Sequence, residues 1–197
     1  VLKKHAWVYE GVRPAAWAAL LWSQSALDYY GQQDPKARYA ENFYGLYAAL
    51  VESHIQCDVI GDGGLTHDRL AKLRVLVLPN AACLSESEAR AVLDFIRAGG
   101  GLVATYRSSL YDDSGVQRAD FSLGEAFGAR YEPDAARRAV AAKYLTKDEQ
   151  SIRGAYLSFP AQHEVLDRIS GTSILPLAYG ICPSRALAGA KVVSTYA

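Results

Sequence analysis

The chain has 197 residues, half of them hydrophobic, and its 21 acidic and 21 basic side chains leave a formal net charge of zero. This size and composition are those of a globular domain, alone or with an appendage, that is large enough to bury a core. No basic stripe or run of like charges indicates binding to nucleic acid or to an anionic membrane surface, and the apolar stretches are too short for a transmembrane helix.

The first half of the chain alternates between strand and helix patterns. The apolar run Ala18–Trp22 predicts a buried parallel strand. A helix is expected from Tyr39, and Cys57–Ile60 is a second short strand. Thr66 can cap a short helix that carries Leu70 and Leu73. The apolar stripe of the helix after Tyr39 consists of Phe43, Leu46, Tyr47, Leu50 and Val51.

The stretch from Arg74 to Ser109 has the clearest local pattern. Val75–Leu78 is a continuous apolar strand, and Ser85 with Glu88 has the spacing of a capping box at a helix start. Three consecutive glycines, residues 99–101, end this helix, because glycine accepts the left-handed geometry of a helix C-terminus. Leu102–Thr105 returns as the next parallel strand. The predicted buried stripe of the helix consists of Ala89, Val92, Leu93 and Ile96.

The rest of the chain has weaker patterns. A polar loop follows from Ser108 to Ala119, and a short helix is expected between Phe121 and Phe127. The segment Glu132–Val140 fits a helix. Three later segments fit strands with antiparallel edges: Tyr156–Phe159, Ile174–Leu175 and Val192–Val193.

These units predict an α/β fold: a flavodoxin-like, doubly wound, mostly parallel sheet with a C-terminal extension that contains strands. The chain contains no methionine and shows no signal pattern at its start, so we expect it to be a piece of a longer polypeptide. We expect three parts: residues 1–14 as a lead-in from an upstream domain, 15–131 as the α/β domain, and 132–197 as an extension packing on that domain.

Cysteine and histidine usage predicts neither a disulfide framework nor a metal site. Cys57, Cys83 and Cys182 are far apart and odd in number, which fits buried thiols or a reducing compartment such as the cytoplasm. The four histidines show no HExxH or HxH spacing, and no motif calls for a cofactor.

Several stretches together resemble one known domain type. They are Leu20-Leu21-Trp22-Ser23, the 44–60 unit, RVLVLPN at 74–80, the triple glycine, Tyr111–Gly115 and Asp120–Leu123. Over residues 15–131 the chain resembles the glutamine-amidotransferase-like domain that follows the catalytic barrel in many glycoside hydrolases. It is most similar to the β-galactosidase trimerisation domain of glycoside hydrolase family 42.

The resemblance implies a non-catalytic companion domain. Its expected partners are copies of itself, a trimer among them, or the upstream catalytic barrel, where it helps to wall the neighbouring active site. The glycosidase carboxylates would belong to that barrel, so no residue of this chain is assigned as acid or nucleophile.

The amidotransferase nucleophile has no counterpart at the expected place. That nucleophile occupies a strained strand-to-helix elbow with small residues two positions before and after it. When GGLVATYRSS, residues 100–109, is aligned with the strand that precedes this nucleophile, Arg107 falls near its position. A guanidinium does not act as a nucleophile. Ser108 and Ser109 have bulky residues at these positions. The alternative is a cysteine-dependent hydrolase or amidotransferase using Cys83, with His163 as its partner.

If the chain has a small-molecule site, we expect it beyond the carboxyl ends of the strands, at the switch point of the sheet, where the strand order reverses. The residues that collect there are Ser23, Gln24, Asn80, Arg107, Ser108 and Asp112. Arg107 is a candidate for binding a carboxylate or pairing with an acid. Adjacent Asp112 and Asp113 fit a turn or a surface ion pair better than an acid–base pair.

Aromatic residues concentrate near the N-terminus, where all three tryptophans lie within the first 22 residues. Such side chains stack on sugar rings, and they also anchor protein interfaces. We expect an interface or core role, with carbohydrate binding as the alternative.

Overall fold

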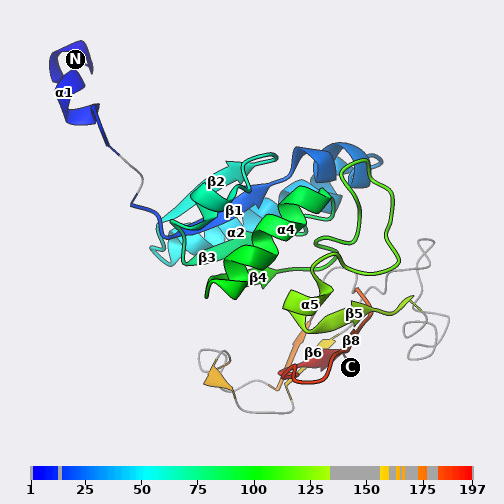
Figure 1. The fold of residues 1–197 in the computed structure, drawn as a ribbon. Coiled ribbons are helices and arrows are strands. Elements are labelled where there is room, and N and C mark those ends of the chain that lie inside the picture. The colour runs from blue at the N-terminus through cyan, green and yellow to red at the C-terminus, as the bar shows by residue number, and fades with distance from the viewer. Residues whose placement is uncertain are drawn as a thin grey trace.

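The computed structural model describes residues 2–12, 15–133, 156–159, 163–164, 166, 173–176 and 182–196. Its centre is a four-stranded sheet in the order β2-β1-β3-β4, and every pairing in it is parallel (Figure 1). The strands are β1 (Ala18–Trp22), β2 (Cys57–Gly61), β3 (Val75–Leu78) and β4 (Gly101–Ala104). This is the flavodoxin-like strand order, so the predicted fold class is confirmed.

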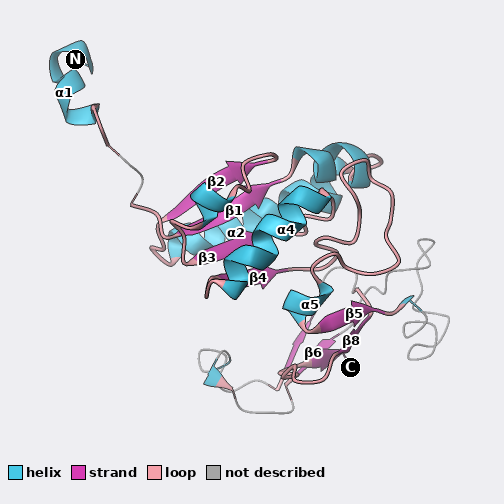
Figure 2. Ribbon diagram, viewed as in Figure 1, coloured by secondary structure: helices cyan, strands magenta, loops and turns pink. Residues whose placement is uncertain are grey.

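Helices lie on both faces of the sheet (Figure 2). They are α2 (Glu41–Glu52) on one face, and α3 (His67–Leu70) with α4 (Glu86–Arg97) on the other. Because successive side chains of a strand point to opposite faces, each face has a core of its own. Leu20 and Val77 pack with Phe43 of α2. The core under α4 is larger; its strand residues are Ala19, Leu21, Ile60, Leu76 and Leu78.

The start of α4 is as predicted. The Glu88 N–H donates to Ser85 Oγ at 3.3 Å, and the Glu88 carboxylate accepts the Ser85 N–H at 2.9 Å, which completes the capping box. The buried stripe differs from the prediction in one respect. Phe95 is fully part of the core, whereas Leu93 and Ile96 are half-buried against it.

The three glycines after α4 have separate roles. Gly99 has the positive φ, 97°, of a helix C-terminus. Gly100 packs directly under the ring of Phe95, where an added Cβ would lie 2.3 Å from the Phe95 Cζ. Gly101 begins β4 and donates its N–H to the Arg74 carbonyl at 2.8 Å. β4 therefore begins and ends one residue before the predicted strand.

Two short π-helical segments precede α2, and the sequence patterns did not reveal them. They are η2 (Ala26–Tyr30) and η3 (Lys36–Ala40), and η3 continues directly into α2. Tyr39, expected to open the helix, lies in η3 with its side chain buried. The spacing of the apolar residues predicted α2 but not the wider π-helical turn before it, since that turn depends on what Tyr39 contacts in the core.

The expectation for Thr66 is corrected in part. Thr66 occupies the position before α3 with extended backbone, but its side chain makes no capping hydrogen bond. Leu73 lies beyond the end of the helix, half-buried against the core.

The chain after β4 forms two small antiparallel sheets, as the predicted extension requires. Residues 124–127 form α5 (Gly124–Phe127), within the predicted short helix. β5 (Ala129–Tyr131) pairs with β8 (Ser184–Ala186).

In the second small sheet, β6 (Tyr156–Ser158) pairs with both β7 (Ile174–Pro176) and β9 (Thr195–Tyr196). The strands near 156 and 174 are confirmed. The strand expected at Val192–Val193 is wrong: the pairing falls at β9, and Val192 is exposed. Most of the helix expected at 132–140 lies outside the described residues.

Near the N-terminus, η1 (Leu2–His5) and α1 (Ala6–Tyr9) lie away from the sheet in Figure 1. Trp7 is 73% exposed there. No helix in the described residues is both long and apolar enough to cross a membrane.

Candidate functional site

Four of the six residues predicted at the strand ends come together in the structure. Ser23 follows β1, Asn80 follows β3, and Arg107 and Ser108 follow β4; all four side chains are buried. Gln24 and Asp112 do not join them. Gln24 is exposed and donates from Nε2 to Asp28 at 2.9 Å.

The hydroxyls of Ser23 and Ser108 at the strand ends have partners within the chain. The Ser23 N–H donates to the Tyr39 hydroxyl at 2.5 Å, and Ser23 Oγ accepts the Ala26 N–H at 3.1 Å. Ser108 Oγ lies 2.9 Å from the Leu78 carbonyl and can donate to it. The switch point is therefore filled by short hydrogen bonds rather than left open for a ligand.

Asn80 is the most constrained of these residues. Its φ is 48°, in the left-handed region, and its side chain is completely buried. Oδ1 accepts the Arg107 N–H at 3.2 Å, and Nδ2 donates to the Arg38 carbonyl at 2.7 Å. Asn80 thus connects the turn after β4 with the segment leading into α2.

Arg107 is enclosed by aromatic rings. Its guanidinium carbon lies 5.2 Å from the centre of the Tyr106 ring and 6.0 Å from that of Tyr30. Nη1 lies 3.3 Å from the Tyr111 hydroxyl and donates to it. These contacts place a buried cation against ring faces, an arrangement in which the ring quadrupole favours the positive charge.

The turn after β4 contains two non-glycine residues with a positive φ, Ser109 and Tyr106, and Tyr106 lies one position before Arg107, the residue expected nearest to the nucleophile position. The φ of Tyr106 is 54°. Ala104 and Ser108 lie two residues before and after it, which is the small-residue spacing that an elbow needs. This spacing was visible in the sequence, but residues 106–123 form turns and a loop rather than a helix, so the strand is not followed by the helix that the elbow needs.

Cys83 does not have the surroundings of a reactive thiol. Its side chain is fully buried with Ala26, Tyr30, Tyr39 and Ala82. Burial raises the pKa of the Cys83 thiol to about 12, well above its ordinary value of 9.0. Nucleophilic cysteines need a lowered pKa and access to substrate. Among the described residues, no hydrogen bond joins this thiol to a histidine.

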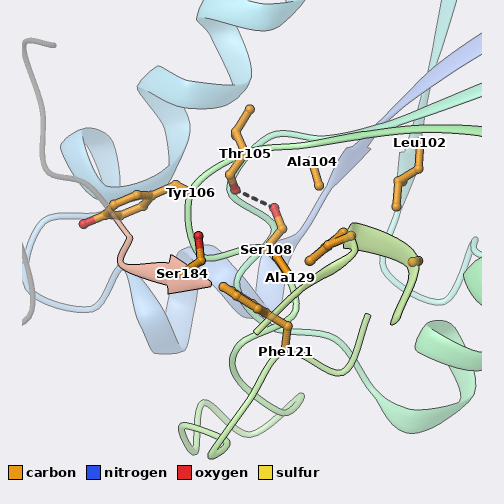
Figure 3. Close-up of a pocket in the computed structure, with 10 residues that line it drawn as sticks. Leu102, Ala104, Thr105, Tyr106, Ser108, Phe121, Ala129 and Ser184 are labelled. Carbon is orange, nitrogen blue, oxygen red and sulfur yellow. Dashed lines mark hydrogen bonds between the residues drawn. The ribbon is translucent and has the colours of Figure 1, made fainter. Parts of the chain in front are cut away.

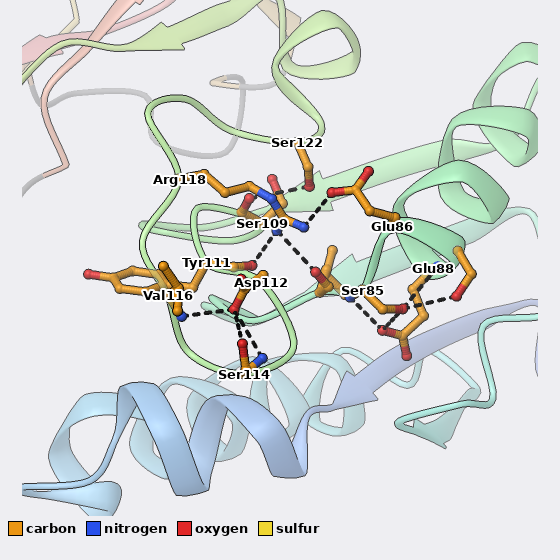
Figure 4. A network of polar contacts seen from close by, with 12 residues as sticks. Ser85, Glu86, Glu88, Ser109, Tyr111, Asp112, Ser114, Val116, Arg118 and Ser122 are labelled. Atoms are coloured by element: carbon orange, nitrogen blue, oxygen red, sulfur yellow. Dashed lines mark hydrogen bonds and ion pairs between the residues drawn. The ribbon is translucent and has the colours of Figure 1, made fainter.

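The loop after β4 is held to α4 through Arg118 (Figure 4). Its guanidinium donates to the Leu84 carbonyl at 3.0 Å and pairs with Glu86 at 2.6 Å. Asp112 closes its own turn: one carboxylate oxygen accepts the N–H groups of Ser114 at 3.0 Å and Val116 at 2.8 Å. These bonds lower the pKa of Asp112. The turn interpretation of Asp112 fits this geometry.

A cavity of about 330 Å³ lies between the end of β4 and the small sheets (Figure 3). Its wall is about equally polar and apolar, and its apolar side chains include Leu102 and Ala104 from β4 and the rings of Phe121 and Phe127. The hydroxyls of Thr105, Ser108 and Ser184 also line it. Among the described residues, no group of three His, Cys, Asp or Glu could hold a metal ion.

An unusual surface is the outer face of α2. We define it as the exposed residues between the exposed Glu41 and Glu52 at the two ends of the helix, none of which carries a charge: Tyr44, Gly45, Tyr47, Ala48, Ala49 and Val51. By contrast, every exposed residue of α4 is polar: Glu86, Ser87, Arg90, Asp94 and Arg97. Both helices have 12 residues and cover the same sheet, so only α4 has the surface expected of a helix facing water.

The aromatic residues near the N-terminus divide between core and surface. Trp22 packs edge-on against Tyr39 at 5.6 Å and Phe43 at 4.9 Å between ring centres. Tyr44 and Tyr47 continue this aromatic group onto the outer face of α2, where Tyr44 is 59% exposed.

The model of the β-galactosidase trimerisation domain family matches residues 16–144. Among solved structures, the catalytic mutant of Gan42B, a GH42 β-galactosidase from G. stearothermophilus, is similar at a TM-score of 0.67 and 20% identity. That similarity covers 99% of this chain and 25% of the other. The β-galactosidase of Rahnella sp. R3 is similar at a TM-score of 0.68 and 21% identity, covering 94% of this chain and 25% of the other.

The β-galactosidase of Bacillus circulans sp. alkalophilus has a TM-score of 0.66 at 15% identity, with 96% of this chain and 26% of the other covered. The chain therefore spans about a quarter of the length of these proteins. At these identities the structures show a shared fold. No curated protein sequence matches the chain.

Proposed function

Because the chain belongs to the β-galactosidase trimerisation domain family, we propose that it is a non-catalytic accessory domain that associates with copies of itself beside the catalytic barrel of a larger glycoside hydrolase. In such an assembly the domain would also wall the active site of a neighbouring barrel. Residues 15–131 would form the α/β domain, and residues 132–197 an extension packed on it. The β5–β8 pairing and the shared packing of Tyr131 with Cys182 support that division.

The observation that carries self-association is the outer face of α2. Tyrosine is enriched among residues that dominate binding energy, because it buries a large area at a small entropic cost. Here Tyr44, Tyr47 and Val51 recur at helical spacing on one uncharged face, and each is at least 40% exposed. A second copy seated on this face would remove that apolar area from water.

The strand-end site supports the non-catalytic part of the proposal. Ser23, Asn80 and Ser108 all use their polar atoms within the chain. Cys83 is buried with a raised thiol pKa, which argues against the cysteine-hydrolase alternative. For the carbohydrate-binding alternative, Trp22 is used within the domain, where it packs on Tyr39 and Phe43, whereas Trp7 and Trp17 are exposed.

The proposal is tested by sedimentation of the 197-residue chain and of Tyr47→Glu, with Arg90→Glu as the matched control. Both variants put a glutamate on an exposed helix position, on α2 and on α4 respectively. We expect the chain to sediment as a trimer, Tyr47→Glu to shift toward monomer, and Arg90→Glu to remain assembled. Circular dichroism checks that both variants fold. A chain that stays monomeric at every concentration contradicts self-association, and equal assembly of both variants contradicts the choice of face.

A further inference from the structure

The two edge strands of the central sheet differ in whether charged side chains bond to their outward backbone groups. At the β2 edge, the Val59 N–H donates to Asp58 Oδ1 at 2.9 Å, and the Val59 carbonyl accepts from Arg69 at 3.3 Å. Asp58 and Arg69 also form an ion pair at 3.1 Å. Charged side chains of this kind are how proteins prevent an exposed strand from pairing with another chain. The β2 edge is therefore protected.

The β4 edge has no such protection in the described part of the chain, where β4 pairs with β3 alone. The N–H groups of Gly101 and Thr105 donate to Arg74 and Leu78, at 2.8 and 3.2 Å. Because alternate residues of a parallel strand bond to opposite sides, the backbone groups of Leu102 and Ala104 face outward. The strand, Gly-Leu-Val-Ala, contains neither a charge nor a proline.

The cavity beside β4 lies at these same two residues. Leu102 and Ala104 line it together with Phe121 and Phe127, and Figure 3 shows Leu102, Ala104 and Phe121 around it. Two of the lining hydroxyls are already used within the chain: Ser108 Oγ contacts the Leu78 and Thr105 carbonyls at 2.9 and 2.8 Å, and Thr105 Oγ1 accepts the Asn80 N–H at 3.0 Å. A strand edge with one free side, next to a cavity whose wall is part polar and part apolar, suits a peptide strand, whose main chain pairs with the edge while an alternate side chain enters the cavity.

We propose that the outer edge of β4 and this cavity bind an extended segment of a neighbouring copy of the chain. This rests on the proposed self-association, which supplies the second copy. Pairing of β4 with the β4 of another copy would be isologous and would close as a dimer. A trimer needs a heterologous contact, so the bound segment is a different part of the neighbour. Its contact with β4 is separate from the outer face of α2.

The test follows amide hydrogen exchange of the 197-residue chain at low and high concentration, alongside sedimentation. Pairing predicts that the Leu102 and Ala104 amides exchange at least about tenfold more slowly in the assembled protein. The Gly101 amide, already bonded to Arg74, serves as the internal reference.

Each other outcome overturns the inference. Assembly with unchanged exchange at Leu102 and Ala104 would overturn it and leave the proposed function standing. Slow exchange at these amides in the monomer would show that the chain covers its own β4 edge. A chain that never assembles would remove both the inference and the proposed function.

A matched pair of variants gives a second readout. Val103 on β4 and Val59 on β2 are 46% and 40% exposed, so lysine fits at either place. Val103→Lys puts a charge on the open edge and should raise the dissociation constant of assembly at least about tenfold, whereas Val59→Lys should not. Equal constants for the two variants would count against the β4 edge, provided that thermal unfolding shows both to be folded.

Discussion

Thr105 Oγ1 accepts a hydrogen bond from the backbone N–H of Asn80 at 3.0 Å, and this contact joins the carboxyl ends of β3 and β4. In doubly wound folds, ligands bind at this edge of the sheet, where the strand order reverses. Here the Asn80 side chain spans the same region, from the Arg107 N–H to the Arg38 carbonyl. The groups that could hold a ligand hold the fold together instead.

Replacing Asn80 should therefore lower the free energy of unfolding of the domain, because its side chain holds the fold together rather than a ligand. Asn80→Ala removes two buried hydrogen bonds and puts a β-carbon residue at a φ of 48°. We expect a loss of about 3 kcal/mol in the free energy of unfolding, measured in urea. Asn80→Gly loses the same bonds without the left-handed strain and should lose about 1 kcal/mol less. If the two variants were equally stable, the backbone conformation would contribute nothing.

Thiol reactivity separates a structural Cys83 from a catalytic one. Cys83 is buried with a raised pKa, whereas Cys57 is half-buried. We expect Cys57 to react first with a thiol reagent in the native chain, and Cys83 to react only when the chain unfolds. Mass spectrometry after limited alkylation identifies the labelled residue. If the reagent labelled Cys83 before Cys57 in the native chain, the result would support the alternative of a cysteine-dependent hydrolase.

The central sheet was predictable from sequence because its signals are local. The apolar runs at Ala18–Trp22 and Val75–Leu78, and the Ser85–Glu88 box, each specify an element over a few residues. The π-helical turn at Tyr39 could not be predicted from the sequence, since the Tyr39 hydroxyl forms hydrogen bonds with Leu21 and Ser23, which are far away in the sequence. The strand near the C-terminus was misplaced for the same reason: short antiparallel strands depend on their partner's register.

The candidate site was only partly predictable. Strand ends follow from topology, so the placement of Ser23, Asn80 and Arg107 could be anticipated. Their partners could not, because Tyr30 and Tyr106 reach Arg107 only through tertiary packing. Gln24 and Asp112 follow the strands in sequence, yet they face other contacts.

The three glycines after α4 give a graded prediction. Gly99→Ala places alanine at a φ of 97° with open space around it and should cost about 1 kcal/mol. Gly100→Ala drives a methyl group into the Phe95 ring and should cost about 2–3 kcal/mol. Gly101→Ala meets its nearest atoms at 3.4 Å and should change stability by less than about 0.5 kcal/mol.

Urea unfolding of the three alanine variants provides the measurement. The expected order of destabilisation is Gly100 first, Gly99 second and Gly101 last. Equal effects at all three positions would mean that the glycines do not have separate roles and that the Phe95 ring moves freely.

The stability of the domain should fall as the solution becomes alkaline, in a window set by its buried thiols. Burial raises the pKa of both Cys83 and Cys182 to about 12, from an ordinary value of 9.0. Above pH 9.0 the unfolded chain loses these protons first, so the folded state binds more protons and the free energy of unfolding decreases until about pH 12.

Urea midpoints between about pH 8 and pH 9 report mainly on the thiols, because burial also raises the pKa of Tyr30 and Tyr39 and unfolded tyrosines, with an ordinary pKa of 10.0, begin to titrate above that range. Cys83→Ala should lower stability at all pH values but flatten the decline, since one titrating group is gone. Cys57→Ala is the comparison: partial burial and the nearby Asp58 also raise the pKa of the Cys57 thiol, but less, so its removal should flatten the decline less than Cys83→Ala does. A Cys83→Ala slope as steep as that of the unmodified chain would mean that the Cys83 thiol ionises alike in the folded and unfolded states, and hence that the core around it admits water.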